Sequence, residues 1–351
     1  MNPVQNAIKN LVGGRDLTEG QAKEAMKCIM SGRATDAQIG SFLTALRMKE
    51  ETVEEITAFA RVMREFAARI SPKVDGTLVD TCGTGGDKIK TFNVSTAAMF
   101  VVAGAGVPIA KHGNRSVTSK AGSADVIEAL GVRIDLPPED VQRCIEETGI
   151  GFMFAPRFHG AMKHAIGPRR EMGIHTVFNI LGPLTNPAGV RAQVIGVYDA
   201  ALTEKLARVQ GNLGCRHAMV VHGLDGLDEI STIGKTRISE LKEDEVKTYT
   251  VEPENFGIWR ANPESIAGRG LDENVRTMLR VLRGGQGPER DIVVLNAAAA
   301  IVVGEKAKNI GDGITVASSS LDSGRAYEKV VQLVEATNGD LKKLKSWEAS
   351  L

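Results

Sequence analysis

The first 70 residues alternate polar and hydrophobic positions with a helical period. Thr18, Thr35 and Thr52 each stand three residues before a Gln or Glu, and each is followed by hydrophobic residues three and four positions apart. Such a start pairs a threonine hydroxyl and a Gln or Glu side chain with the free backbone amides at the beginning of a helix. The pattern predicts three helices, preceded by one that Asn2 caps, and Ser71-Pro72 should end the helical block.

From residue 77 the pattern changes to short apolar runs separated by longer helical segments. Strands are expected at 77–79, 107–110, 150–154, 192–197 and 218–222, with helices at 95–105, 124–130 and 203–213. Residues 155–180 interrupt this rhythm, 231–260 are polar and strand-like, and the tail from 326 is amphipathic helix. The alternation predicts an α/β fold: a small all-helical N-terminal domain and a larger domain with a mostly parallel sheet flanked by helices.

A glycine-rich run at 80–87 follows the first of these strands. Gly83, Gly85 and Gly86 let backbone N–H groups turn toward an anion and remove side chains that would keep a phosphate away. Residues 93–96 then begin a helix, whose free N–H groups and dipole also favour negative charge. Because ligands of open α/β sheets bind at the carboxyl ends of strands, we expect a phosphate-rich ligand here.

Three further polar clusters could serve the same ligand. Residues 111–125 follow the second strand with three cations and four hydroxyls, which suits a loop around phosphates, although alone it could be a solvated basic loop. The adjacent Asp228 and Glu229 suit Mg²⁺, or else form an exposed turn, in which Asp225 is the expected turn residue. Arg169 could bind a carboxylate through two hydrogen bonds, or lie at the surface of a helix start.

Composition and motifs exclude several classes of protein. The 351 residues carry 43 basic and 43 acidic side chains, so no global charge favours nucleic acid or an anionic membrane. The sequence lacks a dinucleotide-binding GxGxxG, a P-loop, a GxSxG elbow and an HExxH motif. Four scattered cysteines suggest reduced thiols, and Cys82 has no evident base beside it. Without a signal-like N-terminus or an apolar run of spanning length, we expect a cytoplasmic protein.

Together these segments resemble the anthranilate phosphoribosyltransferases, of the nucleoside phosphorylase-like phosphoribosyltransferase family. The resemblance extends over nearly the whole chain and rests on GTGGD at 83–87, TFNVST at 91–96, KHGNRSVTSKAGSAD at 111–125, FNILGPLTNP at 178–187 and DGLDE at 225–229. It implies transfer of the phosphoribosyl group of 5-phosphoribosyl 1-pyrophosphate (PRPP) to the amine of anthranilate, releasing pyrophosphate, in tryptophan biosynthesis.

The resemblance also implies two domains with an active site in the cleft between them. Residues 1–72, joined through hinges by part of 156–182, would form a helical domain that mediates homodimerisation, and residues 73–351 would form the PRPP-binding α/β domain. His175 and Gly160 depart from the family pattern, which has Arg and Pro there. Both lie near the expected hinge, so they bear on local loop geometry more than on the reaction.

Site residues are implied in the same way. Those for PRPP are Gly83, Gly86, Asp87, Thr91, Asn93, Val94, Ser95, Thr96, Lys111, His112, Gly113, Asn114, Arg115, Ser116, Val117, Thr118, Ser119 and Ser123. Those for anthranilate are Gly83, Asn114 and Arg169, and those for Mg²⁺ are Ser95, Asp228 and Glu229. No covalent nucleophile or strong base is expected, because the aryl amine is already neutral; Lys111 would stabilise the charge that develops on pyrophosphate.

Two other functions remain compatible with these residues. A nucleoside phosphorylase of similar architecture would also use a helical domain and a glycine-rich phosphate loop. The acidic pair at 228 and 229 argues against it, because a pyrophosphate–Mg²⁺ leaving group needs such ligands and monophosphate chemistry need not. A catalytically silent homologue that binds a nucleotide or nucleic acid is the third hypothesis, which the complete set of clusters and the balanced charge disfavour.

Overall fold

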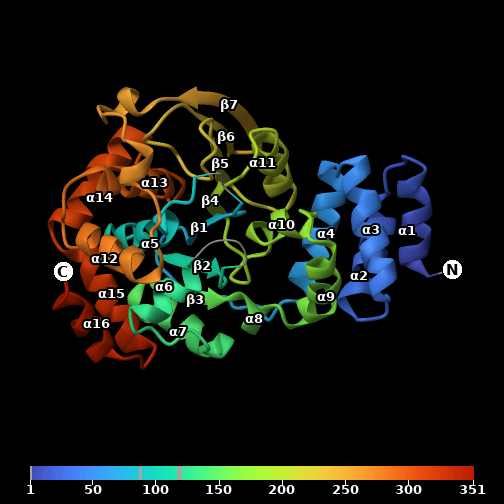
Figure 1. The fold of residues 1–351 in the computed structure, drawn as a ribbon, viewed down its shortest axis with the longest axis horizontal. Helices are drawn as coiled ribbons and strands as arrows, with labels where there is room; N and C mark the ends of the chain where they lie inside the picture. The colour runs from blue at the N-terminus through green and yellow to red at the C-terminus, as the bar shows by residue number, and fades with distance from the viewer. Residues whose placement is uncertain (1, 87–88, 117–120) are drawn as a thin grey trace.

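The computed structural model describes residues 2–86, 89–116 and 121–351 of the chain. A bundle of N-terminal helices stands beside a larger body in which helices surround a sheet (Figure 1). The two termini lie at opposite ends of the molecule in this view. In the described residues, no helix combines the length and the apolar character needed to cross a bilayer.

Four capped helices form the N-terminal bundle: α1 (Pro3–Val12), α2 (Glu19–Met30), α3 (Asp36–Lys49) and α4 (Val53–Phe66). Each begins with a capping box, so the starts predicted at Asn2, Thr18, Thr35 and Thr52 are confirmed. The helical block ends earlier than the predicted Ser71-Pro72. Beyond α4 the backbone amides of Ala68 and Ile70 donate to the carbonyls of Phe158 and Pro187, so the chain leaves the helix to join these distant segments.

The bundle packs around buried aromatic and aliphatic side chains. Phe42 and Phe59 meet edge to face with ring centroids 5.9 Å apart. The buried carboxylate of Glu55 accepts a hydrogen bond from the Leu17 amide at 2.9 Å and pairs with Lys49 at 2.9 Å. A fifth helix from later in the chain, α9 (Lys163–Met172), lies against α2 and α3. The bundle therefore includes a segment that returns from the larger domain.

A seven-stranded sheet forms the centre of the larger body, in the order β3-β2-β1-β4-β5-β6-β7. Five strands are parallel: β1 (Val79–Gly83), β2 (Ile109–Gly113), β3 (Ile150–Phe154), β4 (Ala192–Gly196) and β5 (His217–Gly223). The antiparallel β6 (Thr236–Lys242) and β7 (Glu245–Val251) complete one edge. The mostly parallel sheet predicted from the sequence is confirmed.

Three predicted elements differ in the structure. The strand expected at 77–79 is β1 at Val79–Gly83, because each of these residues pairs with a residue of β4, so the first half of the predicted glycine-rich run belongs to the strand. The strand expected at 107–110 begins at Ile109 and runs to Gly113, because Lys111 and His112 continue the pairing with β3 opposite Phe152 and Met153. The expected helical tail is two helices, since the chain turns at residues 337–340. Polar residues can thus extend a strand where the neighbouring strand supplies the hydrogen bonds.

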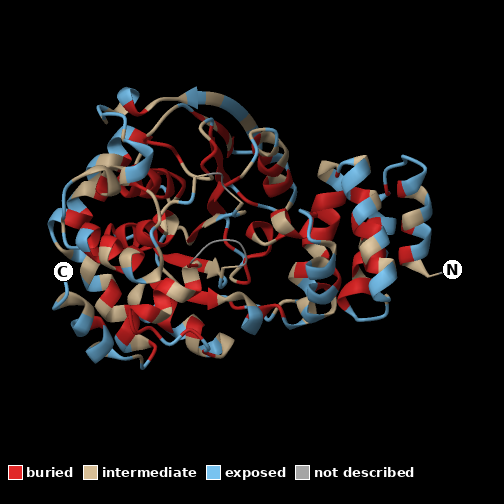
Figure 2. Ribbon diagram, viewed as in Figure 1, coloured by how far each residue is buried: buried red, intermediate tan, exposed pale blue. Residues whose placement is uncertain are grey.

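Helices cover both faces of the sheet. The central α5 (Val94–Gly104) and α13 (Pro288–Val303) pack together beside β1, while α11 (Leu202–Asn212) lies against β5 and β6 and also contacts α4. Figure 2 shows buried residues concentrated along the strands and these helices. The remaining helices are α6 (Ser123–Ala129), α7 (Pro138–Thr148), α8 (Ala155–Phe158), α10 (Phe178–Leu181), α12 (Leu271–Leu282), α14 (Ile310–Asp322), α15 (Arg325–Ala336) and α16 (Leu341–Glu348), with short 3₁₀ turns at Gly160–Met162, Pro183–Thr185, Pro253–Phe256 and Pro263–Ser265.

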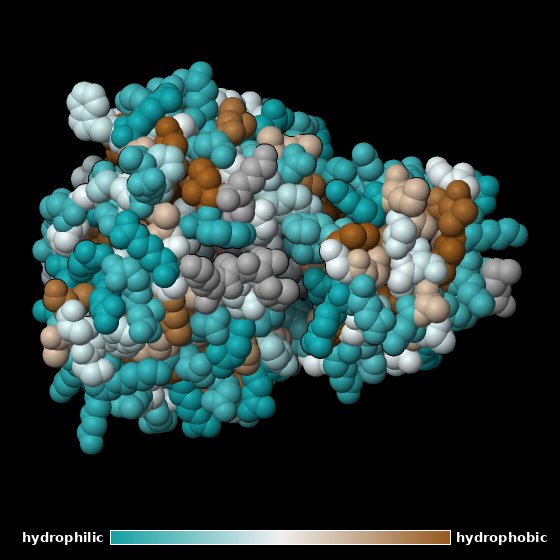
Figure 3. Space-filling model, viewed as in Figure 1, coloured by the Kyte–Doolittle hydropathy of each residue, from teal (hydrophilic) through white to brown (hydrophobic). Residues whose placement is uncertain are grey.

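Several large hydrophobic side chains remain exposed on the helical bundle. Val12 at the end of α1 is 74% exposed and Met48 near the end of α3 is 82% exposed. Ile166 of α9 and Ile174 just beyond it are also exposed. Hydrophobic patches are visible on this part of the surface in Figure 3. Such patches on a helical surface are typical of a protein–protein contact.

Candidate active site

A cavity of about 390 Å³ opens at the carboxyl edge of the parallel strands. Its walls come from the segments after β1, β2 and β5, from the start of α5, and from the α9–α10 region. The predicted site residues that line it are Gly83, Gly86, Thr91, Asn93, Val94, Ser95, Thr96, Lys111, His112, Gly113, Asn114, Arg115, Ser116, Ser123, Arg169, Asp228 and Glu229. Four others, Asp87, Val117, Thr118 and Ser119, fall outside the described residues.

The glycine loop after β1 lies directly against an acidic side chain. A Cβ atom on Gly83 would stand 2.7 Å from Asp228 Oδ2, so no other residue fits without displacing that carboxylate. The Gly85 amide donates to the same oxygen at 3.1 Å. Gly86 has φ +91°, a left-handed conformation that side chains strongly disfavour. The loop and the acidic segment therefore hold each other in place.

The acidic pair also contacts the start of α5. Glu229 accepts a hydrogen bond from the Ser95 amide at 3.2 Å. Asp225 instead accepts from the Leu227 amide and from the Ser231 hydroxyl, and so forms the turn that the sequence predicts for it. Two carboxylates and the Ser95 hydroxyl thus border one cavity. In the described parts of the chain no cluster of three or more His, Cys, Asp or Glu side chains could hold a metal by itself.

This donor set fits Mg²⁺. Magnesium prefers hard oxygen ligands and usually takes one or two protein carboxylates, with water and substrate phosphates completing its octahedron. A site with few protein ligands beside an anion-binding loop has that composition. Asp228, Glu229 and Ser95 are the residues of this chain that would hold the ion.

Lys111 is a buried cation at the end of β2. Its Nζ donates to the carbonyl oxygen of Thr81 and, at 3.3 Å, to the Ser95 hydroxyl. Burial lowers the pKa of Lys111, while the nearby carboxylates of Asp80, Glu229 and Asp228 raise it. Burial outweighs the carboxylates, so the pKa of Lys111 lies below its ordinary value, and its side chain is held between β1 and the start of α5.

Residues at the start of α5 are held by hydrogen bonds across the cavity wall. The Asn93 amide nitrogen donates to the Ala121 carbonyl at 3.2 Å, and its oxygen accepts from Asn274 at 3.1 Å. Thr91 forms an isolated antiparallel bridge with Ala267. These contacts fix the start of α5 in the cavity wall, where the Val94, Ser95 and Thr96 amides donate to the Phe92 carbonyl, to Glu229 and to the Asn93 carbonyl.

The loop after β2 is braced by its own polar groups. Arg115 pairs with Asp125 at 2.8 Å and with Glu128 at 2.9 Å. The Ser123 hydroxyl donates to the Asn114 carbonyl at 3.3 Å. The Arg115 guanidinium is thus engaged with two carboxylates while it lines the cavity.

On the opposite wall, Arg169 of α9 lies over the ring of Phe178, with its guanidinium carbon 5.1 Å from the ring centroid. Burial lowers the pKa of Arg169. His112 faces His159 with ring centroids 4.9 Å apart, and within the described structure no partner meets the shielded Nε2 of His112. A cation and aromatic rings on one wall suit a flat, carboxylate-bearing ligand.

Sequence reasoning missed some of the residues that line the cavity. Lys90, Phe92 and His175 are among them. His175 lies against Gly86 and meets the ring of Tyr198 edge on, with centroids 5.1 Å apart. Its departure from the family pattern was the only signal that drew attention to it. Burial raises the pKa of Cys82 well above its ordinary value, which disfavours the thiolate form.

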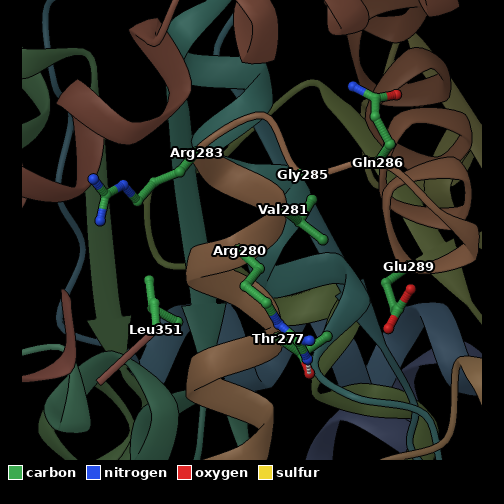
Figure 4. Close-up of a pocket in the computed structure, with 8 residues that line it drawn as sticks. All are labelled: Thr277, Arg280, Val281, Arg283, Gly285, Gln286, Glu289 and Leu351. Atoms are coloured by element: carbon green, nitrogen blue, oxygen red, sulfur yellow. Dashed lines mark hydrogen bonds between the residues drawn. The ribbon is translucent and has the colours of Figure 1, made fainter. Parts of the chain in front are cut away.

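A second cavity, of about 300 Å³, lies on the far side of the larger body, between α12 and the start of α13 (Figure 4). Arg280 donates to Thr277 at 3.1 Å, and Arg283 lies over the ring of Tyr327. Figure 4 shows Arg283 and Glu289 on opposite sides of this cavity. Because its charged groups do not converge, the cavity at the sheet edge is the better candidate for chemistry.

Comparison with known proteins agrees with this geometry. Residues 5–67 match the helical bundle domain of the glycosyl transferase family, and residues 75–327 match the a/b domain of that family. Anthranilate phosphoribosyltransferase of Acetivibrio thermocellus is 56% identical, with 95% of this chain and 97% of the relative covered. That of Methanocorpusculum labreanum is 55% identical, covering 96% and 98%.

Solved structures show the same similarity. The crystal structure of anthranilate phosphoribosyltransferase from Thermus thermophilus superposes with a TM-score of 0.90 at 40% identity, covering 95% of this chain and 99% of the other. The Saccharomyces cerevisiae enzyme in complex with PRPP and Mg has a TM-score of 0.87 at 30% identity, covering 95% and 98%. With both domains matched and identity above one half over nearly the full length, this chain belongs to the glycosyl transferase family and, within it, to the anthranilate phosphoribosyltransferases.

Proposed function

We propose that this chain transfers the phosphoribosyl group of PRPP to the amine of anthranilate. The products are N-(5-phosphoribosyl)anthranilate and pyrophosphate, in a step of tryptophan biosynthesis. The observation that carries the proposal is the single cavity bordered by the glycine loop, Lys111 and the acidic pair. The full-length similarity to anthranilate phosphoribosyltransferases supports it independently.

The PRPP site would comprise the glycine loop, the start of α5 and the loop after β2. The glycine loop, which lacks side chains that would hinder an anion, and the positive end of the α5 dipole would bind phosphate oxygens. Lys111 supports this role because its buried side chain borders the cavity and donates to Ser95, although burial lowers its pKa and the nearby carboxylates oppose that shift only in part. As pyrophosphate leaves the ribose, charge grows on its oxygens, and a fixed cation there stabilises the transition state more than the substrate. Asp87, Val117, Thr118 and Ser119 would complete this site.

Ser95, Asp228 and Glu229 would hold Mg²⁺. When bound, Mg²⁺ neutralises charge on the diphosphate and makes it a better leaving group. The chain's own contribution is to hold Asp228 against Gly83 and Gly85, and Glu229 against the start of α5. The carboxylates are thereby oriented before any ligand arrives.

Anthranilate would bind between Gly83 and Asn114 on the sheet side of the cavity and Arg169 on the opposite wall. The half-buried guanidinium of Arg169 suits the anthranilate carboxylate, and the Asn114 amide can orient the ring or its amine. The aryl amine is neutral at cellular pH, so attack at the ribose requires correct placement more than deprotonation. His112 would make a polar contact to the aromatic substrate without transferring a proton.

We also propose that the chain is a homodimer in the cytoplasm. Residues 1–72, with part of 156–182, would be the dimerisation domain and residues 73–351 the PRPP-binding domain. Exposed Val12 and Met48 on the bundle support this surface as the contact. Light scattering on wild type and on Met48→Glu tests it: we expect a dimer that the charged variant weakens, and a monomeric wild type would contradict the proposal.

One assay separates the competing functions. Purified protein is mixed with Mg²⁺, PRPP and anthranilate, and the loss of anthranilate fluorescence is followed. The same protein is then tested for phosphate-dependent cleavage of thymidine or uridine. We expect activity only in the first assay. Nucleoside cleavage without loss of anthranilate would favour the phosphorylase, and no turnover in either would favour a silent homologue.

A variant pair tests the metal assignment. Asp228→Asn combined with Glu229→Gln keeps the size of both side chains and removes their charge. Activity should collapse while far-UV circular dichroism and the melting temperature are kept. Lys247→Met, an exposed change on β7 remote from the cavity, serves as the matched control and should turn over normally. Near-normal turnover of the double variant would remove the assignment.

A further inference from the structure

A chain of buried polar side chains lies beneath the cavity, inside the sheet. Asp80 of β1, Gln193 of β4 and Gln210 of α11 are each no more than 1% exposed. The Gln210 amide nitrogen donates to the oxygen of Gln193, and the Gln193 nitrogen donates to Asp80 Oδ2 at 2.9 Å. These two hydrogen bonds are both donated in the direction of the Asp80 carboxylate.

The Asp80 carboxylate joins segments that lie far apart in the sequence. Its Oδ1 accepts from the backbone amide of His112 at 3.3 Å, at the end of β2. Gln193, which donates to its Oδ2, also donates to the carbonyl of Pro183 at 2.8 Å. One carboxylate thus connects β1 and the end of β2 with β4, and through Gln193 with the 183–185 turn. Its two oxygens each accept from a different strand.

Among the carboxylates that act on Lys111, the buried Asp80 has the largest effect. The two residues lie on neighbouring strands, and the charge of each favours the ionised form of the other, whereas burial opposes both. Lys111 donates to the Thr81 carbonyl on the same strand as Asp80. Asp80 itself is 0% exposed, so it acts on a ligand only through its neighbours.

We propose that Asp80 is the positioning residue of this site. Its carboxylate holds the end of β2, and therefore Lys111 and the loop that follows, at a fixed place relative to the glycine loop. The inference rests on the proposed phosphoribosyl transfer, since positioning is judged by what Lys111 then does. It assigns a role to a fully buried residue that is not among the predicted site residues.

Asp80→Asn tests the proposal, because it keeps the shape and replaces one acceptor oxygen by a donor. We expect kcat/KM for PRPP to fall at least tenfold. The discriminating measurement is a cycle with Lys111→Met: if Asp80 acts through Lys111, Asp80→Asn/Lys111→Met should stay within threefold of Lys111→Met alone. The proposal would be overturned if the fold-loss of kcat/KM in the double variant equalled the product of the two single losses. It would also be overturned if Asp80→Asn alone kept kcat/KM within twofold of wild type.

Gln210→Leu is the matched control. It removes the buried hydrogen bond between Gln210 and Gln193, which lies at the end of the row of polar side chains remote from Lys111. We therefore expect kcat/KM to stay within twofold of wild type even if the melting temperature falls. All variants are assayed at a temperature at which circular dichroism shows them folded. A tenfold loss of kcat/KM in Gln210→Leu would overturn the proposal, because any damage to the core would then produce the effect.

A second variant keeps the test decisive if Asp80→Asn does not fold. Gln193→Leu/Gln210→Leu replaces both amides by apolar side chains and frees Asp80 Oδ2 from its donor, leaving the bond to His112. We expect kcat/KM for PRPP three- to tenfold below that of Gln210→Leu, and equality with Gln210→Leu would contradict the proposal. Wild-type turnover separates the two hypotheses: an inactive wild type disproves the proposed function, whereas an active wild type with an equally active Asp80 variant disproves only this inference.

Discussion

Acidification should destabilise this protein through two buried histidines. His112 and His159 face each other with ring centroids 4.9 Å apart. Burial, with repulsion between the two rings for His112, lowers the pKa of His112 to about 3 and that of His159 to about 4. Both rings are therefore neutral in the folded protein at pH 5, whereas in the unfolded chain an ordinary histidine titrates near pH 6.5.

The size and sign of the effect follow from these values. A group whose pKa is lower in the folded state binds fewer protons there, so stability is complete above about pH 6.5 and declines as the pH falls toward the folded pKa values. Each histidine contributes about 1.4 kcal/mol per pH unit in that window. Together they should lower the free energy of unfolding by about 3–4 kcal/mol between pH 7 and pH 5.

Urea unfolding followed by circular dichroism at half-unit steps from pH 7 to pH 5 measures this, at constant protein concentration and ionic strength. His159→Phe removes one titrating ring and should halve the histidine contribution to the slope. Phe158→Leu changes a buried neighbour that has no titratable group. It should lower the free energy of unfolding at every pH and leave the slope of that free energy against pH unchanged. A flat wild-type profile, or equal slopes in wild type and His159→Phe, would refute the reasoning.

Four further outcomes are expected. Gly83→Ala should lower kcat/KM for PRPP by about a hundredfold, because its Cβ would stand 2.7 Å from Asp228 Oδ2 and misplace that carboxylate; steady-state kinetics check this. Arg169→Lys should raise KM for anthranilate at least about tenfold with KM for PRPP nearly unchanged, since an ammonium group cannot make a bidentate contact. Glu55→Ala should cost about 1–3 kcal/mol in urea unfolding, because it leaves the buried Leu17 amide without its acceptor and Lys49 with the exposed Asp16 alone, while kcat is kept. EDTA should abolish turnover, and added Mg²⁺ should restore it; turnover that persists in EDTA would contradict a metal requirement.

Local signals account for the part of the fold that the sequence predicts well. The threonines that cap α2, α3 and α4 interact with residues three positions away, so their hydrogen bonds can be read from a short window. The strand at 150–154 is bounded by Gly149, which ends α7 in a left-handed conformation, and it appears at the predicted residues. Where the partner is a distant strand, as for Lys111 and His112 at the end of β2, the boundary moved.

The chemistry-bearing loops were predictable because each follows its own strand, and parallel strands bring their carboxyl ends to one edge. The contacts between those loops could not be predicted from the sequence. Gly83 meets Asp228 and Ser95 meets Glu229 across more than 130 residues of sequence, and no local pattern encodes such a pairing. The buried chain from Gln210 to Asp80 is equally invisible, since isolated glutamines in apolar segments do not reveal their partners.

The cavity takes its two halves from different bodies. Arg169 belongs to α9, which packs on α2 and α3, whereas the glycine loop and Lys111 belong to the sheet. At this junction Gly32, which follows α2, leaves room for the ring of His164 on α9. Directed evolution toward a bulkier acceptor amine therefore has a second region to search, the contact between α2 and α9. Substitutions there would change the distance between Arg169 and the glycine loop, while the residues proposed to bind PRPP stay unchanged.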